Sequence, residues 1–110
     1  MTYDQVFEKV KALFQDADVS GIQEHLAYQF NITGEGAGAF YVEVSDGQLS
    51  IQPYEYHDRD ACFTCSADTL LNIASGKADP IPAVMLGRLK VEGNIEKALK
   101  LKEFLAARKG

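Results

Sequence analysis

The most constraining stretch of the chain runs from Asp79 to Asn94 and reads DPIPAVMLGRLKVEGN. Asp79 is a favourable N-cap and Pro80 suits the first helical position, so the stretch predicts a helix of one or two turns. Gly87 ends that helix. Polar and apolar residues then alternate over residues 88–92, which is the pattern of a strand with one buried face. A final helix is predicted to begin at Asn94.

The other segments show equally regular patterns. Apolar residues at helical spacing follow a capping box formed by Thr2 and Gln5, and the dipeptide Asp46-Gly47 is a strong hairpin signal. Ser66 and Gly76 are a typical N-cap and C-terminal stop. The predicted elements are helices over residues 3–15, 67–75, 80–86 and 95–105 and strands over residues 24–33, 40–45, 48–52, 61–65 and 88–92. This order predicts an α+β fold, with a five-stranded, mainly antiparallel sheet covered by helices on one face.

Composition places the chain among globular proteins. A length of 110 residues, 46% hydrophobic and 25% charged, predicts a single domain over residues 1–110. The chain shows neither a run of about 20 apolar residues nor a signal peptide at its start, so a cytoplasmic location is expected. A pI of about 4.9 argues against nucleic acid as a partner, because phosphate binding needs a broad basic surface.

Charge is divided unevenly along the chain. Residues 1–76 carry three basic and twelve acidic side chains, whereas residues 77–110 carry eight basic and four acidic ones. A basic end on an acidic body can meet lipid head groups, although solvated helix faces are the simpler explanation. The residues expected to contact an anionic membrane surface are Lys77, Arg88, Lys90 and Lys97.

The stretch from Asp79 to Asn94 resembles the hallmark segment of the sterol carrier protein 2 lipid-binding domains, roughly P-x-x-A-x-x-x-G-K/R-x-K-x-x-G-D/N. The matching residues are Pro80, Ala83, Gly87, Arg88, Lys90, Gly93 and Asn94. Residues 60–66, DACFTCS, resemble the strand and cap that precede the hallmark in this family. The resemblance covers residues 60–105 well, and over residues 1–59 it rests on the order of elements.

The resemblance implies a fold built around an apolar tunnel that carries fatty acids, acyl-CoAs, phospholipids or sterols. It implies no catalysis, cofactor or metal. Leu86 stands where several animal relatives have glutamine, so a plain acyl chain is expected to fit at least as well as a sterol. The C-terminal helix is the expected gate.

If the helices leave a hollow above the inner face of the sheet, apolar residues from both layers line it. Met85 is the most typical of such a wall because its thioether adapts to varied ligands. Each candidate is equally eligible to be ordinary core. The predicted ligand-binding residues are Phe30, Ile32, Val42, Phe63, Leu70, Ile73, Met85, Leu86, Leu89 and Leu105.

Three alternatives remain at this point. The pair Cys62 and Cys65 has redox or zinc spacing, but it lies in a strand pattern without a second pair, so buried thiols are favoured. His57 beside Asp60 offers an acid–base pair, but a solvated turn is the simpler interpretation. Another hypothesis is an accessory protein that presents a lipid or isoprenoid intermediate to a partner enzyme.

Overall fold

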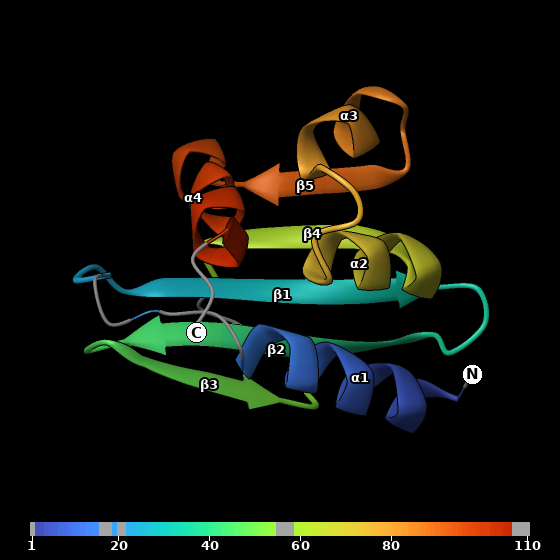
Figure 1. Cartoon of the computed structure of the whole chain (residues 1–110), viewed down its shortest axis with the longest axis horizontal. Coiled ribbons are helices and arrows are strands. Elements are labelled where there is room, and N and C mark those ends of the chain that lie inside the picture. Colours follow the sequence, from blue (N-terminus) through green and yellow to red (C-terminus); the bar gives the residue numbers. More distant parts are fainter. Residues whose placement is uncertain (1, 16–18, 20–21, 55–58, 107–110) are drawn as a thin grey trace.

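The computed structural model describes residues 2–15, 19, 22–54 and 59–106, apart from the side chains of residues 104–106. The elements form an α+β fold with one sheet and helices on one of its faces (Figure 1). The strand order is β3-β2-β1-β4-β5, with β1 and β4 parallel and the other three pairs antiparallel. The elements are α1 (Tyr3–Gln15), β1 (Leu26–Thr33), β2 (Gly38–Ser45), β3 (Gln48–Gln52), β4 (Ala61–Ser66), α2 (Ala67–Ala74), α3 (Pro80–Met85), β5 (Leu89–Gly93) and α4 (Ile95–Ala106).

The predicted order of elements is confirmed, with shifts of one or two residues at the ends. The shifts of two residues are at β1, which begins at Leu26 although alternation was visible from Glu24, and at β2, which begins at Gly38 instead of Phe40. Asp46 and Gly47 both have positive φ, as the predicted tight hairpin between β2 and β3 requires.

An aromatic row crosses the middle of the sheet on its inner face. Phe30 of β1 is paired with Phe40 of β2 and with Phe63 of β4. Its ring stacks on both neighbours, with centroid distances of 5.4 Å to Phe40 and 5.1 Å to Phe63. Such contacts add to the burial energy of the rings themselves. The row therefore joins three strands into one rigid surface.

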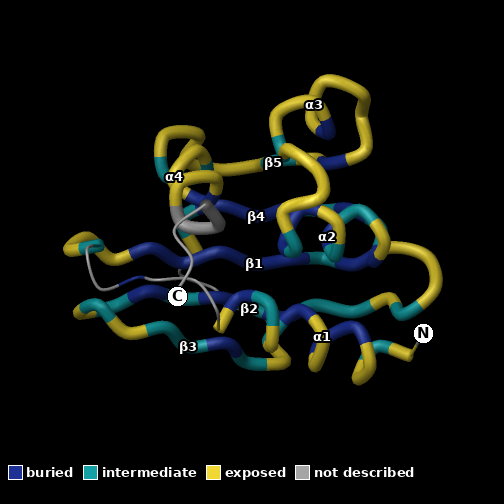
Figure 2. The backbone as a smooth tube through the Cα atoms, viewed as in Figure 1, coloured by how far each residue is buried: buried dark blue, intermediate teal, exposed yellow. Residues whose placement is uncertain are grey.

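Helix α1 packs onto this surface with its apolar stripe (Figures 1 and 2). Phe14 contacts Phe30 at 5.6 Å and Phe7 contacts Phe40 at 5.7 Å between ring centroids. Val6 and Val10 between them are fully buried. The inner face was expected to leave a tunnel beneath the helices, but here aromatic side chains fill the space under α1.

The chain passes from β5 to α4 through Gly93, which has a φ of +102°. A Cβ atom at this position would lie 2.6 Å from the carbonyl oxygen of Asp60, so only glycine fits without a shift of the backbone. The amide of Asn94 donates to the same oxygen at 2.8 Å, and its side chain accepts from Lys97 N at 3.1 Å as the N-cap of α4. The direction of α4 is therefore fixed by the start of β4.

Candidate functional site

An apolar groove of about 250 Å³ lies at the β5 edge of the molecule, between α3 and α4. Its floor comes from β4 and β5, and its two walls come from the two helices. Among the described residues that line it, all but one have apolar side chains. They are Phe63, Pro80, Ile81, Val84, Met85, Leu89, Val91, Ile95, Ala98, Leu99, Leu101 and Lys102.

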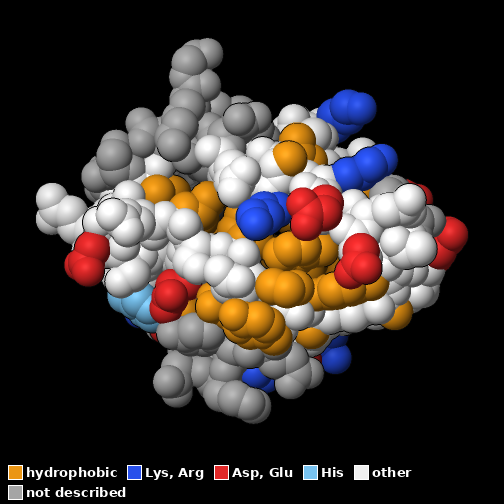
Figure 3. Space-filling model, turned by 90° about the horizontal axis from the view of Figure 1, so that it is seen from below, with side chains coloured by type: hydrophobic (Ala, Val, Ile, Leu, Met, Phe, Trp, Pro, Cys, Tyr) orange, Lys and Arg blue, Asp and Glu red, His pale blue; other side chains and the backbone are white. Residues whose placement is uncertain are grey.

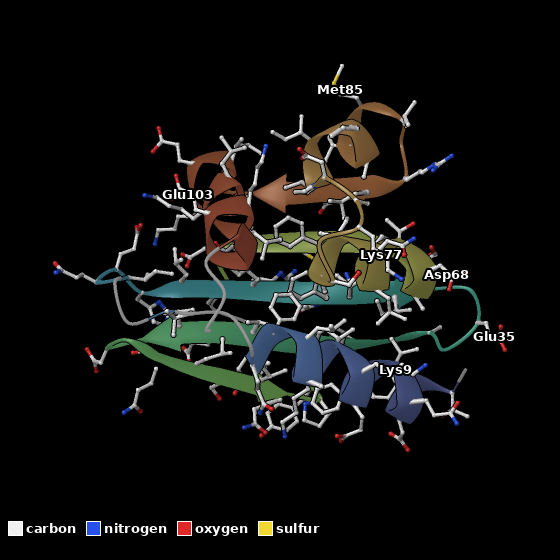
Figure 4. All side chains as sticks on the ribbon, in the orientation of Figure 1. Lys9, Glu35, Asp68, Lys77, Met85 and Glu103 are labelled. Carbon is white, nitrogen blue, oxygen red and sulfur yellow. The ribbon has the colours of Figure 1, made fainter. Side chains whose placement is uncertain are left out.

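The groove is open to solvent, because much of its wall is exposed (Figure 2). Met85 is 82% exposed, Leu99 55% and Ile95 56%, while Leu89 on the floor is buried. In Figure 4, Met85 projects from α3 away from the sheet. Large apolar side chains gathered around a hollow indicate a binding surface, since isolated exposed residues would not share one cavity.

The wall formed by α3 is held by its two ends. Asp79 Oδ1 accepts a hydrogen bond from Ile81 N at 2.9 Å as the N-cap, and Pro80 occupies the first turn, as predicted. After the predicted stop at Gly87, the amide of Arg88 donates to Ala83 O at 2.8 Å. Ala83 is the buried contact of this short helix, which leaves its other face free for the groove.

The wall formed by α4 is attached at its N-terminal half. Tyr28 Oη donates to the carbonyl oxygen of Lys97 at 2.5 Å, and burial, with the nearby Asp60 carboxylate, raises the pKa of that phenol. Lys97 Nζ lies 3.1 Å from Asp60 Oδ1, while Asp60 Oδ2 accepts from Ala27 N at 2.9 Å. Leu101, 2% exposed, is the buried apolar anchor of the helix.

The two walls are joined by one ion pair. Lys102 Nζ on α4 lies 3.2 Å from Asp79 Oδ2 at the start of α3. The hydrogen bond from Ile81 N and the ammonium of Lys102 together lower the pKa of the Asp79 carboxyl. Asp79 is therefore ionised at neutral pH and connects both helices that border the groove.

The family model for the SCP-2 sterol transfer family matches residues 7–106. The chain belongs to this family. Mouse hydroxysteroid dehydrogenase-like protein 2 is 31% identical over 103 residues, which are 93% of this chain and 21% of the mouse protein. The chain thus spans about a fifth of the length of that relative.

Solved structures share the SCP-2 fold. Sterol carrier protein 2 of Aedes aegypti in complex with palmitate, a C16 fatty acid, has a TM-score of 0.64 and 22% identity, over 99% of this chain and 98% of that one. The sec-alkylsulfatase Pisa1 of Pseudomonas sp. has a TM-score of 0.77 and 20% identity, over 100% of this chain and 17% of that one. The same fold therefore occurs both alone and within a larger enzyme.

Within this SCP-2 domain, three of the predicted ligand-binding residues line the groove, namely Phe63, Met85 and Leu89. Ile73 and Leu86 instead line a smaller depression of about 150 Å³ between α2 and α3, with Leu86 69% exposed. The predicted wall position of Leu86 is therefore outside the main groove.

The other predicted ligand-binding residues lie elsewhere. Four of them are buried in the core and do not line the α3–α4 groove, because side chains packed on the sheet fill the space around them: Phe30, Ile32, Val42 and Leu70. Leu105 belongs to α4, but its side chain lies outside the described residues.

Sequence reasoning missed much of the α4 wall. Ile95, Leu99 and Lys102 follow an i, i+4, i+7 spacing and so share one face of the helix. That spacing was visible, but an apolar stripe on a helix ordinarily faces the core. Ile81 and Val84 repeat the same pattern on α3. Whether such an apolar stripe faces the core or the groove depends on how α3 and α4 pack against the sheet, which the spacing does not specify.

The two cysteines are confirmed as buried thiols on opposite faces of β4. Asn31 Nδ2 donates to Cys62 Sγ at 3.1 Å on the outer face, and Cys65 faces the core, where burial raises its pKa to about 11. Burial also raises the pKa of Cys62. In the described part of the chain, no cluster of three metal-ligating side chains occurs.

The expected basic surface is divided. Lys97 pairs with Asp60 at 3.1 Å, and its contact with a membrane stays a prediction. Lys90 is exposed on β5 and pairs with Glu92 at 3.3 Å. Arg88 is exposed at the depression between α2 and α3, whereas Lys77 is exposed at a groove between α1 and α2. The proposed acid–base pair is not formed by described residues, because His57 lies outside them.

A second groove of about 360 Å³ lies between α1 and α2 and is more polar, with Lys9 and Lys77 at its sides (Figure 4).

Seen from the β3 edge, the side opposite α3 also carries apolar side chains among acidic ones (Figure 3). Among the described helices, none is long and apolar enough to cross a bilayer. Of these three hollows lined by described residues, the α3–α4 groove has the most apolar wall, and it is open to solvent.

Proposed function

We propose that the chain is a non-catalytic lipid-binding and lipid-transfer domain that holds an acyl chain in the α3–α4 groove. The observation that carries the proposal is the solvent-open, almost wholly apolar groove at the β5 edge. Sterol carrier protein 2 of Aedes aegypti, which has the same fold, was solved in complex with palmitate, and this supports a fatty acid as the ligand class. The ligand-binding residues proposed are Phe63, Met85, Leu89 and their neighbours in the wall.

Transfer energetics agree with this ligand class. Each buried methylene contributes about 0.8 kcal/mol, so about fourteen methylenes of palmitate offer roughly 11 kcal/mol. Association costs at least about 4 kcal/mol, which leaves roughly 7 kcal/mol and a Kd near 10 µM. The groove therefore needs no strong polar contact to bind a fatty acid.

The size of the groove supports α4 as the gate. Ligand sites typically hold about 300–1,000 Å³, whereas this groove holds about 250 Å³. Among the described side chains of the C-terminal half of α4, Lys102 forms an exposed ion pair that contributes little to stability. An outward movement of the residues after the buried anchor Leu101, with opening of this pair, would enlarge the groove. Exposed Met85, with Arg88 three residues later in the chain, would face the donor membrane.

The test is an NMR titration of ¹⁵N-labelled protein with palmitate. Binding in the groove is expected to shift the amide signals of α3, β5 and α4, including those of Val84, Leu89 and Leu99. The signals of Leu13 and Leu71, in the groove between α1 and α2, serve as the internal control. Shifts confined to the control groove, or no shifts at millimolar palmitate, would contradict the proposal.

A second candidate is a module that presents its lipid to an enzyme. The region that matches this chain is 21% of the mouse relative and 17% of Pisa1, which favours a partner domain for this fold. The two functions differ in a vesicle assay. A carrier accelerates the transfer of a fluorescent fatty acid between vesicles, whereas a presenting module binds the fatty acid without accelerating its transfer.

A further inference from the structure

Lys102 has an unusual position in the groove. It is the one charged side chain among the described lining residues, and it lies in the last part of the α4 wall. Its side chain is 49% exposed, so the aliphatic stem can cover apolar surface while the ammonium reaches water. A lysine of this kind can stabilise a negative charge at the end of an apolar ligand.

The present partner of Lys102 is held by other contacts. Asp79 uses Oδ2 for Lys102 and Oδ1 for the N-cap hydrogen bond from Ile81 N. The cap therefore survives when the ion pair opens. Because both side chains are nearly half exposed, the pair contributes little to stability. If a ligand carboxylate takes the place of Asp79 as the partner of Lys102, the stability of the fold should therefore change little.

The groove runs from Lys102 along the length of α4. Ile95, seven residues before Lys102, lies about 10 Å away along the helix axis. Leu99 lies between them on the same face, and all three line the groove. A ligand with its charge at Lys102 would therefore place its tail beside Leu99 and Ile95.

We propose that Lys102 binds the carboxylate of a long-chain fatty acid and releases Asp79 as it does so. This inference rests on the proposed function and adds the head-group contact. The groove would then select fatty acids over uncharged lipids of the same chain length. Lys102 is a specificity residue in this scheme, and the apolar wall supplies most of the affinity.

The experiment compares laurate with dodecanol, which have equal chains and different head groups, by isothermal titration calorimetry. Lys102→Met keeps the aliphatic stem and removes the charge. We expect it to weaken laurate binding about fivefold and to leave dodecanol unchanged. Lys100→Met is the matched control, because Lys100 lies on the same helix, pairs with Glu24 at 3.4 Å and does not line the groove.

Asp79→Asn gives an independent test, because the expected change in laurate affinity is opposite to that of Lys102→Met. Asparagine retains the N-cap but cannot hold Lys102 as an ion pair, so laurate binding is expected to strengthen while dodecanol binding stays the same. If the ion pair only connects the two helices, this variant weakens both ligands instead. A thermal melt of each variant confirms that it is folded.

The outcomes separate the two proposals. If the unmodified chain binds neither laurate nor dodecanol, the proposed function is wrong. If it binds both and Lys102→Met changes neither affinity, or weakens both equally, the head-group contact is wrong. Weaker laurate binding by Asp79→Asn would overturn the exchange of partners.

Discussion

Filling the α3–α4 groove from within gives the most direct test of where an acyl chain binds. Ala98 is half-buried on α4 and lines the groove. In Ala98→Phe, the ring occupies space that a ligand would otherwise use. If it excludes about three methylenes at 0.8 kcal/mol each, binding loses roughly 2.4 kcal/mol, which is about a fiftyfold rise in Kd.

The unliganded variant is expected to remain folded, because the new ring enters an existing apolar hollow and displaces no core side chain. Palmitate affinity is measured by displacement of a fluorescent fatty acid, and stability is measured by urea unfolding. Ala12→Phe is the control, since Ala12 lines the groove between α1 and α2. It should leave the affinity unchanged.

The reasoning would be refuted if folded Ala98→Phe bound palmitate as tightly as the unmodified chain. The acyl chain would then lie elsewhere. Loss of affinity in Ala12→Phe but not in Ala98→Phe would assign the ligand to the α1–α2 groove.

The remaining predictions concern the framework around the groove. Gly93→Ala should lower the free energy of unfolding by roughly 2 kcal/mol or more, because the new Cβ meets a backbone carbonyl; Gly34→Ala, with a φ of +76° but no atom nearby, should cost less in the same urea titration. Tyr28→Phe should cost about 1 kcal/mol by removing the hydrogen bond to α4, and an undiminished unfolding midpoint would contradict that role. In native protein at pH 8, iodoacetamide should modify Cys65 more slowly than a free thiol by about a hundredfold or more, since its pKa is raised to about 11 from 9.0. Cys62, which is 7% exposed, should react before Cys65, and mass spectrometry of peptides from a time course would show the order.

Local signals in the sequence were sufficient for most of the fold. The ends of α3 could be predicted without knowing its neighbours, because their signals are local. These are the N-cap Asp79, Pro80 in the first turn and Gly87 with its positive φ. Alternation of apolar and polar residues likewise predicted the strands, and the burial of β2 follows it. In β1 both faces are covered, since residues 26–30 are all buried, Gln29 included.

The site was less predictable, because it depends on which apolar faces meet each other. Phe30 and Met85 were both predicted to line the hollow, yet Phe30 is 1% exposed within the aromatic row and Met85 is 82% exposed at the mouth of the groove. The row fills the space under α1, whereas α3 lies beyond the edge strand and has no such partner. Side-chain packing between distant segments decides this difference.

The parallel pairing of β1 with β4 has a consequence for how the molecule opens. This ladder joins the β3-β2-β1 meander to the half that carries α3, β5 and α4, and it is the strand pairing through which the sheet continues from one half to the other. Regions with few buried contacts exchange their amide hydrogens through local opening, while central strands exchange only on global unfolding. Deuterium should therefore enter α3 and α4 well before β1, and the groove can loosen around a guest while the aromatic row stays intact.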